Sequence, residues 1–224
     1  MHKTQILSLI KSIKDGSLSP EKALEELRHL PYEDLTFAKA DHHRHLRQGI
    51  PEVILARGKT VPEIRAIAKS MYKRSKRFLI TKATSSLHRK LGLKKVTFYP
   101  SAGLIVVGEE VKRKKGLIVV LSAGTSDIPA AEEAAVTASF LGSNVKTVYD
   151  VGVAGIHRLL DKRKDFSLAK VIVVVAGMEG ALASVVGGLT DKPIIAVPTS
   201  TGYGTSLGGL TALFAMLNSC VPGI

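Results

Sequence analysis

The second half of the sequence alternates between apolar runs and helical stretches, and this alternation constrains the fold more than any other feature. Four apolar runs have the composition of buried parallel strands: residues 117–121, 145–149, 171–175 and 194–197. Helical stretches follow them at residues 129–140, 153–160, 180–189 and 205–217. The order predicts a three-layer α/β/α domain with a doubly wound parallel sheet. Right-handed crossovers bring the loops after the strands to one edge, where such sheets bind ligands.

The first half predicts a helical hairpin followed by a small basic α/β domain. A helix is expected over residues 4–15, and a second one begins with Ser19 as its cap and Pro20 in its first turn, ending at Pro31. Thr60 and Glu63 form a capping box that opens a longer helix. Strands are expected near Phe37 and at residues 53–55, 78–81, 96–99 and 104–107, with a helix at 85–91. We therefore expect three parts: residues 1–34, 35–116 and 117–224.

Charge is distributed unevenly between the two halves. Residues 1–116 hold 25 Lys and Arg against 11 Asp and Glu, a formal charge of +14, whereas residues 117–224 carry −1. A basic half indicates an anionic partner or, more simply, lysines that keep the protein soluble. The sequence lacks aromatic residues in an RNA-binding pattern, so we expect no nucleic acid partner.

Composition also bears on compartment and class. Hydrophobic residues make up 45% of the chain, enough for a packed core. A single cysteine excludes a disulfide framework and a multi-cysteine zinc site, and we expect a cytoplasmic protein. Residues 171–189 are almost wholly apolar but contain Glu179 and four glycines, which favours a buried strand and helix over a membrane span.

The loop after the first of the four strands has the composition of an anion-binding loop. It reads Ser122-Ala123-Gly124-Thr125-Ser126-Asp127 and precedes a helix. Small residues allow backbone N–H groups to approach an anion, and the helix N-terminus adds positive potential. The loop has neither the Rossmann nor the P-loop spacing. Asp127 is a candidate for ribose binding, for a metal such as Mg²⁺, or for a plain helix cap.

Two further loops lie at the same predicted edge. Gly177, Met178 and Glu179 follow the third strand, and a carboxylate between glycines suits a general base, although it would also complement a helix dipole. We favour the functional interpretation, because an apolar surrounding makes a purely structural carboxylate costly. Residues 198–206, rich in hydroxyl groups and glycine, follow the fourth strand as a second phosphate or ribose contact, or as a flexible loop.

Other chemistry-bearing residues are less specific. Cys220 stands alone in an apolar context, which by itself favours an inert thiol. The segment from Asp41 to Arg47 contains three histidines but no separated ligand set that would complete a metal site. Arg44 and Arg47 are candidates for binding a carboxylate or phosphate, and Lys59 lies in a nearby segment.

The second half resembles the PurE family, the aminoimidazole ribonucleotide carboxylases and mutases. The resemblance rests on residues 122–127, on Ala176-Gly177, on residues 193–198 and on the final Pro-Gly-Ile. The chain departs where that family has a histidine in a Gly-Gly-Ala-Ala-His-Leu stretch, since it reads Gly-Met-Glu-Gly-Ala-Leu over residues 177–182.

Where the chain departs from the PurE family it resembles the LarB family, the carboxylases of nickel-pincer nucleotide cofactor biosynthesis. This second resemblance extends over nearly the whole chain. The matching segments are residues 41–44, 47–53, 58–60, 122–127, 132–134, 176–181 and 218–220. The resemblance implies carboxylation of nicotinic acid adenine dinucleotide at pyridine C5 with carbon dioxide or bicarbonate. It also implies hydrolysis of the phosphoanhydride, which releases AMP and leaves pyridinium-3,5-biscarboxylic acid mononucleotide.

The resemblance implies roles for the residues singled out above. Cys220 becomes the nucleophile that adds to the pyridinium ring, and Glu179 the base. Ser126 and Asp127 would hold phosphate, ribose or Mg²⁺, and the basic half would bind the anionic parts of the dinucleotide. The residues implied for binding are Ser122, Gly124, Thr125, Ser126, Asp127, Gly177, Met178, Arg44, Arg47 and Lys59.

The sequence also gives expectations for the cofactor, the assembly and the alternative functions. We expect Mg²⁺ as the one ion and no tightly bound organic cofactor. We also expect a homo-oligomer, an octamer by resemblance, and no membrane partner. The alternatives are a PurE-like carboxylase or mutase, for which Cys220→Ala would leave activity intact, and a nucleic-acid-binding protein, for which binding would depend steeply on salt.

Overall fold

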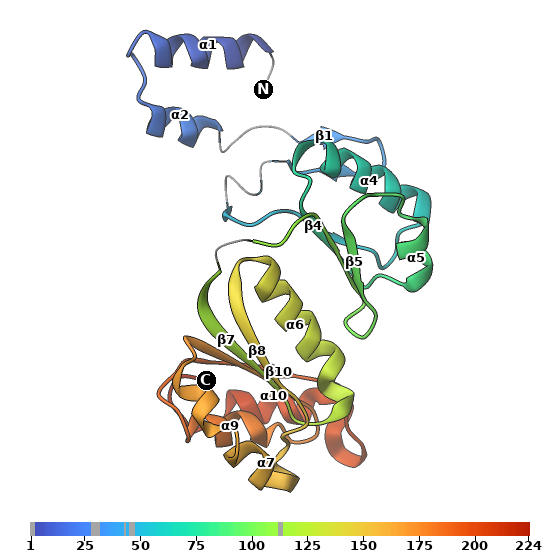
Figure 1. Ribbon diagram of the computed structural model, residues 1–224, viewed down its shortest axis with the longest axis vertical. Helices are drawn as coiled ribbons and strands as arrows, with labels where there is room; N and C mark the ends of the chain where they lie inside the picture. Colours follow the sequence, from blue (N-terminus) through green and yellow to red (C-terminus); the bar gives the residue numbers. More distant parts are fainter. Residues whose placement is uncertain (1–2, 28–31, 43, 45–47, 112–113) are drawn as a thin grey trace. The chain divides into compact units, whose positions relative to one another are not determined.

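The computed structural model describes residues 3–27, 32–42, 44, 48–111 and 114–224. The chain divides into two compact units, one formed by residues 1–98 and 105–109, the other by residues 99–104 and 110–224. Figure 1 shows the elements of each unit. Among the described residues no helix is both long enough and apolar enough to span a bilayer.

The first unit opens with the expected hairpin of α1 (Lys3–Lys14) and α2 (Pro20–Leu27). Ser19 caps α2, since its Oγ accepts the N–H of Lys22 at 3.3 Å. A two-stranded sheet follows, β1 (Glu33–Asp34) with β2 (Lys39–Ala40). Phe37 lies in the turn between these strands, 49% exposed, and not in a strand as its apolar character suggested.

A four-stranded sheet forms the body of the first unit. Its order is β3-β4-β6-β5, with β3 parallel and β6 antiparallel to β4. The elements are β3 (Val53–Leu55), α4 (Val61–Arg74), β4 (Phe78–Thr81), α5 (Ser85–Lys90), β5 (Val96–Tyr99) and β6 (Leu104–Val107). The capping box at the start of α4 is confirmed, because the Thr60 and Glu63 side chains bond each other's backbone N–H. The core lies between α4, α5 and this sheet.

The second unit is the expected three-layer α/β/α domain. Its parallel sheet has the order β10-β9-β7-β8. The strands are β7 (Lys115–Ser122), β8 (Ser143–Val148), β9 (Val171–Ala176) and β10 (Ile194–Pro198). The α-helices are α6 (Ile128–Phe140), α7 (Ile156–Leu160), α8 (Arg163–Ser167), α9 (Ala181–Gly187) and α10 (Leu210–Leu217). Short 3-10 helices occupy Thr125–Asp127, Val153–Gly155 and Gly204–Gly209.

The two faces of this sheet are covered differently. Helix α6 packs on one face, where Ala131 and Ala135 meet Val120 and Val173. Helices α7, α8 and α9 cover the other, with Leu159, Phe166 and Leu182 among its buried residues. Figure 1 shows α6 on the opposite side of the strands from α7 and α9. The central strands β7 and β9 are buried over most of their length and are apolar runs in the sequence, whereas the edge strand β8 contains exposed polar residues.

Candidate active site

A cavity of about 430 Å³ lies at the carboxyl ends of the strands of the second unit. Ligand cavities of small-molecule enzymes have volumes of this order. The loops after β7, β8, β9 and β10 all contribute to the lining: residues 123–127, Asp150, residues 152–154, Arg158, residues 176–179, Ala181, Leu182 and Thr201. The structure therefore brings together Gly124, Thr125, Ser126, Asp127, Gly177, Met178 and Glu179.

Asp127 organises the first loop of the cavity. Its side chain is 3% exposed, and its two oxygens accept different hydrogen bonds. Oδ2 accepts the N–H of Gly124 at 2.9 Å, which closes the loop on itself. Oδ1 accepts the hydroxyl of Thr199 at 2.6 Å, which ties the loop after β7 to the loop after β10. Asp127 makes no side-chain cap bond to α6. Its two hydrogen bonds instead fix the relative position of two cavity walls.

The turn after β9 forms a second wall and is tightly constrained. Met178 has a φ of +55°, a backbone conformation unusual for a residue with a side chain. Its N–H donates to the carbonyl of Thr201 at 2.7 Å, and Gly180 N–H donates to the carbonyl of Gly177 at 2.9 Å. A Cβ on Gly177 would lie 2.2 Å from the Thr201 carbonyl oxygen. Only glycine therefore lets these two loops approach so closely.

Arg158 and Asp150 are cavity residues that the sequence analysis missed. Arg158 Nη1 lies 2.5 Å from Asp150 Oδ2, and both side chains remain about two-fifths exposed at 40% and 47%. A Cβ on Gly155 would come within 2.7 Å of Arg158 Nε, so this glycine leaves room for the guanidinium. Asp150 lies two residues after the end of β8. The rule that ligands bind at the carboxyl edge of such a sheet was the signal that could have found it.

Two residues of the predicted site have surroundings different from those expected. Ser122 does not line the cavity: its side chain is fully buried, and its Oγ accepts the N–H of Asp150 at 3.1 Å. This bond supports the loop after β8. Glu179 lines the cavity but is exposed, so our premise of an apolar surrounding was wrong. Its carboxylate is open to solvent at the mouth, where α9 begins.

Cys220 is not among the residues that line this cavity. It is a free, exposed cysteine three residues beyond the end of α10. Its neighbour Ser219 bonds the hydroxyl of Ser184 on α9 at 2.9 Å, and Val221 packs against Gly187 at the end of that helix. The neighbours of Cys220 thus contact α9 at Ser184 and Gly187, whereas Glu179 lies before the first turn of this helix.

The predicted basic residues belong to the first unit. Arg44 Nε lies 4.0 Å from an Asp41 oxygen, and Lys59 Nζ donates to the carbonyl of Leu55 at 3.0 Å. Arg47 lies outside the described residues. The Asp41 N–H donates to Glu52 Oε2 at 2.8 Å. Burial raises the pKa of Glu52 above its ordinary value, and this N–H opposes the rise.

The residues of the cavity do not form a dedicated metal site. Both Asp127 oxygens already accept hydrogen bonds, and Asp150 is paired with Arg158. In the part of the chain that the structure describes, no group of three His, Cys, Asp or Glu side chains lies close enough to hold a metal ion. Mg²⁺ in such sites is commonly held by substrate phosphates with one or two carboxylates.

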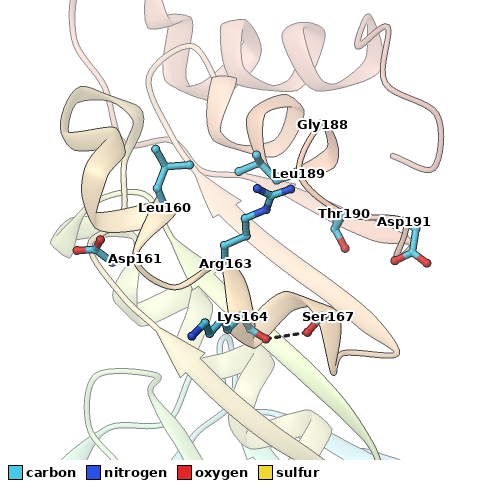
Figure 2. A pocket seen from close by; sticks show the side chains of 9 residues that line it. All are labelled: Leu160, Asp161, Arg163, Lys164, Ser167, Gly188, Leu189, Thr190 and Asp191. Atoms are coloured by element: carbon cyan, nitrogen blue, oxygen red, sulfur yellow. Dashed lines mark hydrogen bonds between the residues drawn. The ribbon is translucent and has the colours of Figure 1, made fainter.

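A larger hollow, of about 810 Å³, lies elsewhere in the same unit. Figure 2 shows its lining, in which Arg163 extends toward Leu189 from α8. Its walls come from the ends of α7 and α8 and from residues 188–191, which precede β10. These residues adjoin the amino ends of the strands, whereas open parallel sheets bind ligands at the carboxyl ends. We therefore assign the candidate site to the smaller cavity.

Comparison with known proteins identifies both halves of the chain. The family model described as the LarB/PurE-like N-terminal domain matches residues 32–109, and the AIR carboxylase model matches residues 117–224. An uncharacterized protein of Methanocaldococcus jannaschii is 39% identical over 228 residues, which cover 96% of this chain and 88% of that protein. The N5-carboxyaminoimidazole ribonucleotide mutase of the same organism is 33% identical over 111 residues, covering 48% of this chain and 65% of that enzyme.

These matches agree with the fold and with the resemblance inferred from the sequence. The AIR carboxylase match covers the three-layer domain that contains the cavity, and the LarB match covers the small α/β domain before it. The relationship indicates a carboxylase-type enzyme. The chain belongs to the LarB family, and its C-terminal half is a PurE-like domain.

Proposed function

We propose that this protein carboxylates C5 of the pyridinium ring of nicotinic acid adenine dinucleotide and hydrolyses the phosphoanhydride of that substrate. The products are pyridinium-3,5-biscarboxylic acid mononucleotide and AMP, the first serving nickel-pincer cofactor biosynthesis. The observation that carries the proposal is the pairing of a LarB-type N-terminal domain with a PurE-like domain in one chain. The cavity at the carboxyl edge of the PurE-like sheet supports it.

The cavity offers groups suited to an anionic dinucleotide. Arg158 presents a guanidinium that Asp150 holds in place, and such a group binds carboxylates and phosphates through paired N–H donors. The Ser126 hydroxyl and the backbone of the loop that Asp127 closes lie on another wall. We assign Arg158 to an anionic group of the substrate and this loop to a phosphate or ribose.

The proposed chemistry requires a nucleophile because a pyridinium ring is electron-poor. Addition of the Cys220 thiolate at C4 or C6 forms a carbon–sulfur bond and converts the ring to a neutral dihydropyridine. C5 is then the nucleophilic carbon of an enamine and bonds to carbon dioxide, which leaves the ring cationic. Removal of the C5 proton by Glu179 restores the enamine, and departure of the thiolate restores the pyridinium. Separately, water cleaves one P–O bond of the phosphoanhydride to release AMP.

The test is incubation of the full chain with nicotinic acid adenine dinucleotide, bicarbonate and Mg²⁺, followed by mass spectrometry of the nucleotides. We expect AMP and a mononucleotide that carries a second carboxylate. Cys220→Ala should lose the carboxylated product, and Cys220→Ser provides the matched control of similar size. Heavy-isotope bicarbonate should label the new carboxylate.

An aminoimidazole ribonucleotide is tested separately as the alternative substrate, because the second half is also related to the M. jannaschii mutase. Turnover of this compound by both the original protein and Cys220→Ala, with none of the dinucleotide, would contradict the proposal. AMP formation without carboxylation would leave only the hydrolase part of the proposal standing.

A further inference from the structure

The larger hollow of the second unit, of about 810 Å³, takes no part in the proposed reaction. It is lined by the ends of α7 and α8 and by residues 188–191, which lead from α9 to β10. The lining alternates with the core, since Leu160 and Ser167 line the hollow whereas their neighbours Leu159 and Phe166 are fully buried. Close packing of these neighbours holds the walls in place, so the hollow belongs to the rigid part of the unit.

Arg163 supplies the group in this hollow that indicates a ligand. Its side chain extends from α8 toward Leu189 in Figure 2. Over the part of the chain that the structure describes, its guanidinium makes no hydrogen bond or ion pair. A guanidinium has five N–H donors in one plane and binds a carboxylate or phosphate through two of them at once. With these donors free in a concave surface, Arg163 is suited to an anionic group of a ligand.

The carboxylates that line the hollow do not cancel its positive charge. Asp191 is paired with Lys192, whose Nζ lies 2.9 Å from a carboxylate oxygen. The other lining carboxylate, Asp161, makes no ion pair with a described residue, and Lys164 offsets its charge. The two lining cations and Lys192 therefore exceed the two carboxylates by one positive charge. This excess favours an anion over a cation in the hollow.

An apolar surface and a hydroxyl lie in the same lining as Arg163. Leu160, which is 48% exposed, and Leu189 form the apolar part. The Oγ of Thr190 accepts the N–H of Lys192 at 3.3 Å, which leaves its own proton free to donate. Small-molecule sites commonly combine apolar walls with a few polar groups in this way. An inorganic anion would leave the leucines uncovered, whereas a neutral ring would leave the guanidinium without a partner.

We propose that this hollow is a second ligand site, which takes a small molecule with a carboxylate or phosphate on an apolar ring. Arg163 binds the anionic group, Thr190 donates a hydrogen bond to it, and the two leucines contact the ring. Binding there does not depend on the proposed reaction, because the hollow adjoins the amino ends of the strands and the candidate active site lies at their carboxyl ends. The ligand and the dinucleotide can therefore be bound at the same time.

Calorimetric titration of the full chain with four small probes tests this site. Phenyl phosphate and benzoate combine a ring with an anionic group, whereas benzamide has the ring alone and inorganic phosphate the charge alone. We expect phenyl phosphate to bind about 10-fold more tightly than inorganic phosphate, or benzoate to exceed benzamide by the same factor. The pair that shows the difference identifies the anionic group as a phosphate or a carboxylate. If neither probe exceeds its matched control, the site is rejected.

Two arginine variants locate the binding. Arg163→Ala should weaken binding of the preferred probe about 10-fold or more. Arg163→Lys keeps the charge but loses the paired donors, so its affinity should fall between the two. Arg158→Ala is the matched control, because it removes the guanidinium of the candidate active site and should leave binding unchanged. Binding that is lost in Arg158→Ala and kept in Arg163→Ala would overturn the proposal.

Photolabelling of the unaltered protein provides a readout that needs no variant. An azide derivative of the preferred probe, irradiated with the protein, should attach to peptides that contain residues 160–167 or 188–191. An excess of the parent probe should suppress this labelling, which peptide mass spectrometry measures. Labelling confined to residues 150–158 and 176–182 would place the probe in the smaller cavity and would also overturn the proposal. Labelling of the hollow in a protein without dinucleotide turnover would retain the second site and reject the proposed function.

Discussion

Replacing Asp127 should loosen the cavity because this carboxylate joins two of its walls. Asp127→Ala removes the acceptor of the Gly124 N–H and of the Thr199 hydroxyl. A donor left without its partner in a buried site costs about 1 to 3 kcal/mol. Both donors belong to half-buried residues, so we take the lower part of this range for each. The expected loss is about 2 to 4 kcal/mol in the free energy of unfolding of the second unit.

Asparagine is the matched control for this prediction. Its carbonyl can accept the Gly124 N–H, and its amide can donate to the Thr199 hydroxyl, which is able to act as an acceptor. Asp127→Asn should therefore cost less than about 1 kcal/mol, although it removes the charge. Thr199→Val keeps the shape and deletes the hydroxyl, so the double variant with Asp127→Ala should be less destabilised than the sum of the two single variants.

Hydrogen exchange of peptides from β7 and α6 is the suitable assay, because it reports opening of the second unit separately from the first. Slow-exchanging amides in these peptides give the free energy of opening for each variant. The reasoning would be refuted if the alanine and asparagine variants lost equal stability. Strict additivity of Asp127→Ala and Thr199→Val would refute the bond between the two loops.

Three other variants test separate parts of the structure. Gly177→Ala drives a Cβ to 2.2 Å from the Thr201 carbonyl oxygen and should lower stability by about 1 to 3 kcal/mol, measured by thermal unfolding; an unchanged midpoint would contradict the tight contact. Arg158→Ala should raise KM for the dinucleotide about 10-fold or more with a smaller change in kcat, Arg158→Lys falling between; an unchanged KM would remove this residue from the substrate site. The folded-state pKa of Glu52 is raised above 4.5, so its contribution to the stability of the first unit is full below the unfolded-state pKa and is lost as pH rises through the folded-state value. Glu52→Gln should flatten that loss in urea titrations from pH 4 upward, and parallel pH profiles of the two proteins would exclude the effect.

Local sequence patterns predicted most elements of the fold because their causes are local. Periodicity placed the four strands of the second unit within one or two residues, and the Thr60–Glu63 box marked the start of α4. Helix α8 was missed because it is only five residues long and has no side-chain cap. Phe37 was misassigned because an aromatic residue alone does not distinguish a strand from an exposed turn.

The candidate site was predicted in part, because the strand order of an α/β domain decides which loops converge. The loop at residues 122–127 and the turn at Gly177 were expected at one edge, and the structure places residues 123–127 and this turn along the cavity. The pairing of Arg158 with Asp150, the burial of Ser122 and the exposure of Glu179 depend on how the loops pack in three dimensions.

The sequence by itself determined most of the elements, the parallel sheet and the family, since these follow from hydrophobic periodicity, capping residues and motifs that are continuous along the chain. Only the tertiary structure decided which of the chemistry-bearing side chains meet. Asp127 reaches Thr199 across 72 positions of the sequence, whereas Ser219 and Val221, on either side of Cys220, contact Ser184 and Gly187 of α9. No short-range pattern specifies such distances, because they arise from the packing of helices on the sheet.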